Sequence, residues 1–84
     1  MKAIRWRRDD DGVYARLGGL RLEVWPTVPS GWSVAIGLEL IGDPGGHPTR
    51  RAAKAAAIRI AVKRLRAAVR RGEAELARIE EAIR

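Results

Sequence analysis

The sequence contains no cysteine and only one histidine among its 84 residues. Without cysteine, neither a disulfide nor a thiolate metal site can hold the fold together, so a hydrophobic core must do so. The single histidine, His47, cannot fill a zinc shell, and Asp43 is the only nearby carboxylate that could orient it for catalysis. We therefore expect no catalytic residues, no metal site and no cofactor, and a binding protein in place of an enzyme.

Long apolar runs are also missing. No stretch approaches the roughly 20 residues that a membrane span needs, so we expect no membrane partner. The basic N-terminus is not followed by the apolar segment of a signal peptide. A cytoplasmic protein of one domain is therefore expected, or one in the host cytoplasm if a phage encodes it.

Acidic residues are absent from residues 50–72, which carry nine arginines and lysines. Residues 1–49 are neutral overall, residues 73–84 have a net charge of −2, and the whole chain has a net charge of +7. Such asymmetry indicates a polyanionic partner, which could be nucleic acid, an acidic protein surface or a nucleoprotein complex. The alternative is an ordinary solvated helix face.

Apolar and polar residues alternate through the first half of the chain, which is typical of half-buried strands. Turn-forming segments separate the runs, and short connections favour an antiparallel meander. We predict four antiparallel strands within residues 2–41, the last one formed by the long alternating run Trp32–Ile41, and then a loop at residues 42–48.

A basic helix is predicted for residues 49–71, with Thr49 as its N-cap. Gly72 either ends this helix, leaving residues 72–84 as a second short helix, or is tolerated within one continuous helix. Apolar residues follow a heptad-like rhythm: Ala55, Ile58, Val62, Leu65, Val69, Gly72, Leu76, Ile79 and Ile83. In a continuous helix the last three would project beyond the sheet, which favours a homodimer through the C-terminal helix.

The predicted fold class is therefore α+β: a four-stranded antiparallel β-meander with one long C-terminal helix packed across one face. The core should join Ile58, Val62, Leu65 and Val69 to one sheet face, with small alanines at 55, 61 and 68 permitting close approach. The sheet side of this core should comprise Trp6, Val13, Leu22, Val24, Trp32, Val34, Ile36 and Leu38.

Two surfaces are candidates for partner binding. One is a basic stripe on the helix, formed by Arg59, Lys63, Arg66 and Arg70. The other is the open face of the sheet, where Trp25, Arg16 and Arg21 could stack bases and neutralise phosphates or anchor a protein interface. The sequence leaves open which of the two faces binds.

The segment Gly45–Ala57 (GGHPTRRAAKAAA) resembles the last helix of double-stranded-RNA-binding domains. In that family a Gly-rich turn, a Ser/Thr cap and basic residues precede Ala-rich turns. The resemblance implies that Arg50, Arg51 and Lys54 grip phosphates across the major groove. The family's N-terminal helix has no counterpart in this chain, so its minor-groove contacts are not implied.

The whole chain also resembles small proteins of phages and prophages, some of which are anti-CRISPR inhibitors. The shared features are an N-terminal strand with Trp6, the Gly18-Gly19-Leu20 step, Gly31-Trp32 and the start of the helix. This resemblance implies a role but no site. The leading hypothesis is a non-enzymatic inhibitor that occludes a host nucleoprotein defence complex, and the alternatives are a direct nucleic-acid-binding module and a structural dimer.

Overall fold

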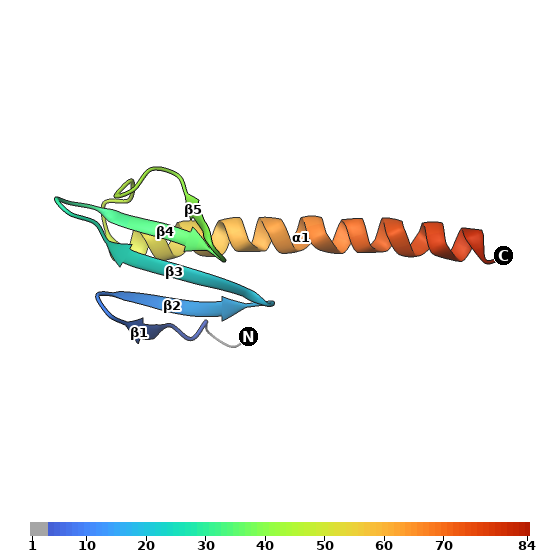
Figure 1. The fold of residues 1–84 in the computed structure, drawn as a ribbon, viewed down its shortest axis with the longest axis horizontal. Coiled ribbons are helices and arrows are strands. Elements are labelled where there is room, and N and C mark those ends of the chain that lie inside the picture. Colours follow the sequence, from blue (N-terminus) through green and yellow to red (C-terminus); the bar gives the residue numbers. More distant parts are fainter. Residues whose placement is uncertain (1–3) are drawn as a thin grey trace.

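Five strands and one long helix follow one another along the chain in the computed structural model, which describes residues 4–84. The strands form one antiparallel sheet in the order β1-β2-β3-β4-β5, and α1 crosses one face of it (Figure 1). The elements are β1 (Arg7–Asp9), β2 (Gly12–Leu17), β3 (Leu20–Pro26), β4 (Trp32–Ile36), β5 (Glu39–Ile41) and α1 (Arg50–Ala82). The prediction of an α+β fold with an antiparallel sheet and one long C-terminal helix is confirmed.

The hairpin of β2 and β3 supplies the middle of the sheet. Gly18 and Gly19 both have positive φ, 56° and 83°, which suits the tight two-residue connection between these strands. The resulting register places Ala15 opposite Leu22 and therefore on the same face of the sheet. This face is buried against α1, and its fully buried residues include Leu22, Val24, Val34 and Ile36.

The sheet has five strands, whereas the alternation of apolar and polar residues predicted four. The long alternating run is split at Gly37, which has a φ of +65°, and the chain reverses there to form β5. Leu38 is fully exposed in this turn, and Leu40 pairs with Ala35 on the open face. The prediction that Leu38 belongs to the core is therefore wrong, because the turn ends the two-residue alternation.

The N-terminal strand is shorter than expected. It begins at Arg7, whereas the predicted sheet started at residue 2, which lies outside the described residues.

Helix α1 begins directly after Thr49, whose hydroxyl accepts a hydrogen bond from the Ala52 N–H at 3.1 Å. Its 33 residues continue through Gly72, which gives a length of about 50 Å. The side that faces the sheet is lined by alanine, with Ala53, Ala56, Ala57 and Ala61 at most 3% exposed. These small side chains allow the helix backbone to approach the sheet closely.

The helix is rotated relative to the predicted packing. Ala55 and Ala68 are exposed, and Val69 is 57% exposed, so these three predicted core contacts are wrong. The physical reason is that the alanine side permits the closest contact with the sheet. The larger Ile58, Val62 and Leu65 consequently lie on one flank of the helix, where each is half-buried.

The molecule is elongated because α1 extends well past the sheet (Figure 1). The radius of gyration is 16.3 Å and the principal extents are 59 × 27 × 18 Å, whereas a compact chain of this length would have a radius of gyration of about 12 Å. Every residue from Ala68 to Arg84 is exposed. No helix within residues 4–84 combines the length and the apolar character needed to cross a bilayer.

Candidate functional site

The basic stripe of α1 comprises Arg59, Lys63, Arg66 and Arg70. Steps of four, three and four residues place these side chains on one side of the helix, over an axial distance of about 16 Å. All four are exposed, and none forms an ion pair with another of residues 4–84. The neighbouring Arg64 differs, since it pairs with Glu39 of β5 at 3.1 Å. The stripe is therefore a row of cations whose charges are not neutralised by carboxylates of residues 4–84.

At 100° per residue, α1 has three sides about 120° apart. One carries the buried alanines, the second carries the basic stripe, and the third carries the apolar residues that begin with Ile58. Because the basic stripe is turned away from the sheet, a partner can reach it without displacing the core.

The start of α1 adds a second group of cations. The Arg50 guanidinium lies 5.9 Å from the ring centroid of Trp32, and the Lys54 ammonium lies 5.2 Å from that of Trp6. Arg51 is exposed, and the first turn contains no acidic residue. Cations at a helix N-terminus oppose the helix dipole, so an anion bound there would relieve an unfavourable arrangement.

Arg16 lies at the basic end of the open sheet face. Together with Arg5, Arg7 and Tyr14 it lines a shallow hollow of about 430 Å³. None of the three arginines of this hollow pairs with a carboxylate of residues 4–84. Arg5 and Arg7 alternate along the chain with Trp6, which packs against the core, and this alternation predicts them on the open sheet face.

Arg21 is directly opposite Arg16 in the β2–β3 pair, but its charge is neutralised within the protein. Its guanidinium contacts Glu23 at 2.6 Å and Asp9 at 3.1 Å, and it lies over the Tyr14 ring at 4.1 Å from the centroid. The hydrogen bond to the Glu23 carboxylate, together with the charges of Glu23 and Asp9, raises the pKa of Arg21. The guanidinium of Arg21 is therefore used in contacts within the sheet face.

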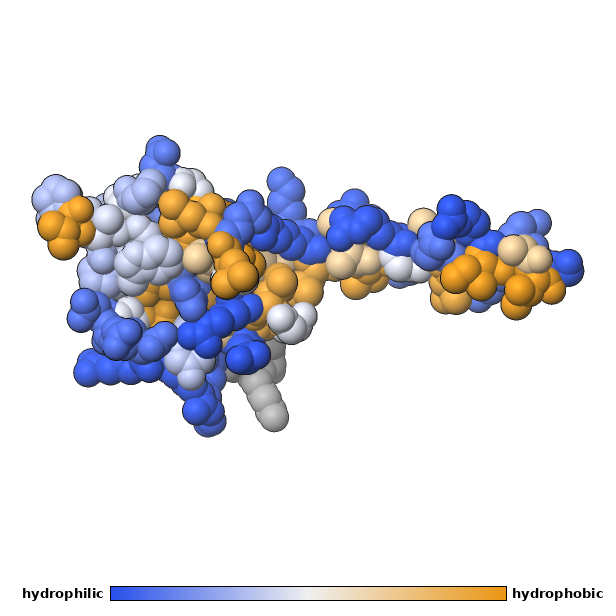
Figure 2. Space-filling model, in the orientation of Figure 1, coloured by the Kyte–Doolittle hydropathy of each residue, from blue (hydrophilic) through white to orange (hydrophobic). Residues whose placement is uncertain are grey.

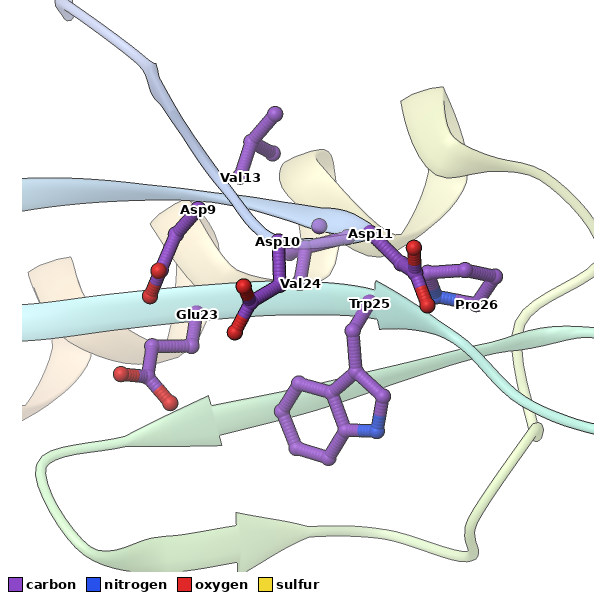
Figure 3. Close-up of a pocket in the computed structure, with 9 residues that line it drawn as sticks. Asp9, Asp10, Asp11, Val13, Glu23, Val24, Trp25 and Pro26 are labelled. Carbon is purple, nitrogen blue, oxygen red and sulfur yellow. The ribbon is translucent and has the colours of Figure 1, made fainter.

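Trp25 lies at the acidic end of the same sheet face. Its half-buried side chain lines a hollow of about 270 Å³ that also contains Asp9, Asp10, Asp11 and Glu23. Figure 3 shows the indole ring and these carboxylates around the start of β2 and the middle of β3. Trp25 thus shares a hollow with four acidic side chains, of which Asp9 and Glu23 pair with Arg21, whereas the alternation pattern grouped it with arginines.

His47 contributes to the fold through its main-chain groups. Its N–H and C=O exchange hydrogen bonds with Trp32 at 3.2 and 2.7 Å, which attaches the loop before α1 to the start of β4. Within the described part of the chain, no group of three or more His, Cys, Asp or Glu side chains is placed to hold a metal ion.

Comparison with protein-family models, with curated proteins and with solved structures found no match to this chain. The candidate surfaces must therefore be interpreted from their own geometry and charge.

Proposed function

We propose that this chain is a non-enzymatic protein that binds the phosphate backbone of nucleic acid through the basic stripe of α1. The observation that carries the proposal is the row of four exposed cations, none of them paired with a carboxylate of residues 4–84. Cations placed along a helix displace counterions when they contact phosphates, and this release drives binding. Arg50, Arg51 and Lys54 extend the positive surface to the helix N-terminus.

Fluorescence anisotropy with labelled duplexes of about 20 base pairs tests this proposal at low salt. The double variant Lys63→Gln/Arg70→Gln removes two cations of the stripe and should weaken binding about 10-fold or more. The matched control is Arg78→Gln on the same helix, because Arg78 is exposed and already paired with Glu75. Absence of binding by the wild type, or equal effects of the two changes, would refute the proposal.

Duplex RNA and duplex DNA are separate arms of that experiment. The resemblance of Gly45–Ala57 to double-stranded-RNA-binding domains implies preference for duplex RNA, with Arg50, Arg51 and Lys54 on phosphates. In that case Arg51→Gln should reduce the affinity for RNA more than for DNA. Equal affinities would leave general phosphate binding in place and remove the specific RNA role.

A second candidate function is the occlusion of a nucleoprotein complex, as in anti-CRISPR inhibitors. The observation that favours it is the sheet face, where the carboxylates around Trp25 would repel phosphates but suit a basic protein surface. Under this proposal the helix contacts the nucleic-acid part of the complex and the sheet contacts its protein part. Pull-down with purified interference complexes tests it, and loss of capture on Trp25→Ala should accompany retention of free nucleic-acid binding.

A further inference from the structure

The part of α1 beyond the sheet exposes large apolar side chains on one side. Val69, Leu76, Ile79 and Ile83 are 57, 56, 49 and 78% exposed, respectively. Figure 2 shows apolar surface gathered along one side of the projecting helix, with hydrophilic surface on the other. Towards the sheet the same side continues into a groove of about 510 Å³ whose apolar lining comes from Leu17, Val62, Leu65 and Val69.

The exposed apolar side chains of α1 need another surface to cover them. Residues 68–84 are all exposed, so no packing against the sheet stabilises this part of the helix. Most helical stability in proteins comes from packing of the apolar side against another element. With Gly72 included, the residues of this side from Ile58 to Ile83 are spaced alternately four and three residues apart over 26 residues, which is the pattern of a coiled coil.

We propose that a second copy of this chain covers the apolar side of α1, with the two helices packed antiparallel. The charged residues next to the apolar seam determine which partner fits it and in which direction the two helices run. One flank of the seam is formed, at intervals of seven residues, by Arg59, Arg66, Glu73 and Glu80. The first two are basic and the last two are acidic. Two copies of this flank therefore attract each other only when the two helices run in opposite directions.

An antiparallel pair places Arg66 beside Glu73 of the second copy and Arg59 beside Glu80 of the second copy. Symmetry repeats both pairs, so that four attractive contacts border the seam. In a parallel pair the flanking contacts join Glu75 to Glu80 of the second copy, which is repulsive, and supply no attractive pair. Opposite charges across the boundary at Gly72 therefore select the antiparallel direction.

The same register matches every apolar residue of the seam. Its centre lies between Arg70 and Arg71, close to the boundary between the basic and acidic parts of the helix. The facing layers are Ile58 with Ile83, Val62 with Ile79, Leu65 with Leu76, and Val69 with Gly72. The end of the second helix thus occupies the groove beside Leu17, where Val62 and Leu65 form the floor.

This inference does not rest on the proposed nucleic-acid binding, but the two proposals share Arg59 and Arg66. The dimer directs Arg59 and Arg66 towards glutamates of the second copy, whereas Arg70 borders the groove that the second helix occupies. Lys63 lies on the outer side of the pair. A variant of Lys63 therefore reports on phosphate binding, and variants of Glu73 and Ile79 report on dimerisation.

The direction of pairing can be measured because the chain has no native cysteine. A spin label attached after Arg84→Cys gives an intermolecular distance by double electron–electron resonance. The antiparallel register predicts about 40 Å between the two labelled positions, whereas a parallel pair predicts about 10 Å. A short distance, or no intermolecular coupling at a protein concentration of about 100 µM, would overturn the proposal.

Sedimentation velocity tests the seam and its charges. Ile79→Lys should raise the dimer dissociation constant at least tenfold, whereas the control Ala74→Lys, on the opposite side of the helix, should leave it within about twofold. Arg66→Glu and Glu73→Arg should each weaken the dimer, and the double exchange should restore it. Because residues 68–84 lie outside the core, these changes should leave the sheet folded, and the strand contribution to the circular dichroism spectrum should be unchanged. Failure of the double exchange to restore the dimer would contradict the register.

Discussion

At the scale of single residues, two glycines and a serine fix the place where α1 begins. Gly31 has a φ of +87°, and a Cβ atom there would lie 2.1 Å from the carbonyl oxygen of Gly45. Ser33 is 1% exposed, and its hydroxyl accepts a hydrogen bond from the Gly45 N–H at 2.8 Å and shares another with Thr27. These contacts hold the loop at residues 42–48 against the sheet and so position Thr49 and the first cations of the helix.

Substitution of Gly31 tests this loop contact. Gly31→Ala should reduce the free energy of unfolding by about 3 kcal/mol, because positive φ and a backbone clash act together. Gly37→Ala is the matched control: its φ is also positive, but no atom lies within 4 Å of the added Cβ, so the cost should be about 1 kcal/mol. Urea denaturation measures both values, and equal losses would show that the contact with Gly45 does not matter.

At the scale of elements, α1 combines three tasks on three sides. Its alanine side holds the sheet, its basic side carries the candidate phosphate contacts, and its apolar side is left uncovered beyond Leu65. The weakest position for helix formation is Gly72, where a Cβ atom would meet nothing within 4 Å. The part of the helix beyond the sheet should therefore be the least stable region of the protein.

Replacement of Gly72 tests that expectation. Gly72→Ala should stabilise the helical state there by about 1 kcal/mol and slow amide hydrogen exchange in residues 68–82 by about fivefold. The exchange of β3 amides should stay the same, since this segment lies outside the core. Unchanged exchange beyond residue 68 would contradict the view that Gly72 limits the stability of the helix end.

The sequence predicted the elements well where local chemistry decides them. Gly18-Gly19 fixed the central hairpin, and the Thr49 cap was expected from its position before an alanine-rich segment. The turn at Gly37 was missed because a lone glycine within an alternating run also fits an uninterrupted strand. The rotation of α1 was missed because the heptad pattern selects large residues, whereas close contact with the sheet selects alanine.

The candidate site was less predictable, because it depends on residues distant in the sequence. Arg59, Lys63, Arg66 and Arg70 share a helix side, so their spacing was enough to group them. Arg21 gave no such signal: its pairing with Asp9 is fixed by strand register, twelve residues away. For the same reason the presence of Asp9, Asp10 and Asp11 in the hollow that Trp25 lines could not be predicted from the immediate neighbours of Trp25 in the sequence.

At the scale of the whole molecule, the sheet half and the helix differ in both charge and shape. The sheet half is neutral and compact, and the helix carries the excess positive charge before an acidic end. An antiparallel dimer would pair Arg59 and Arg66 of each copy with glutamates of the other, and it would place the remaining stripe cations of both copies on one rod with a sheet at each end. Such a particle presents phosphate-binding surfaces over a length greater than either copy provides.

The salt dependence of nucleic-acid binding tests the central claim most directly. Measured by fluorescence anisotropy, the logarithm of the association constant should fall linearly with the logarithm of the salt concentration. Lys63→Gln/Arg70→Gln should reduce the magnitude of that slope by about two, because each substitution removes one cation that neutralises a phosphate. A slope near zero for the wild type, or one that the double variant leaves unchanged, would contradict binding through the basic stripe.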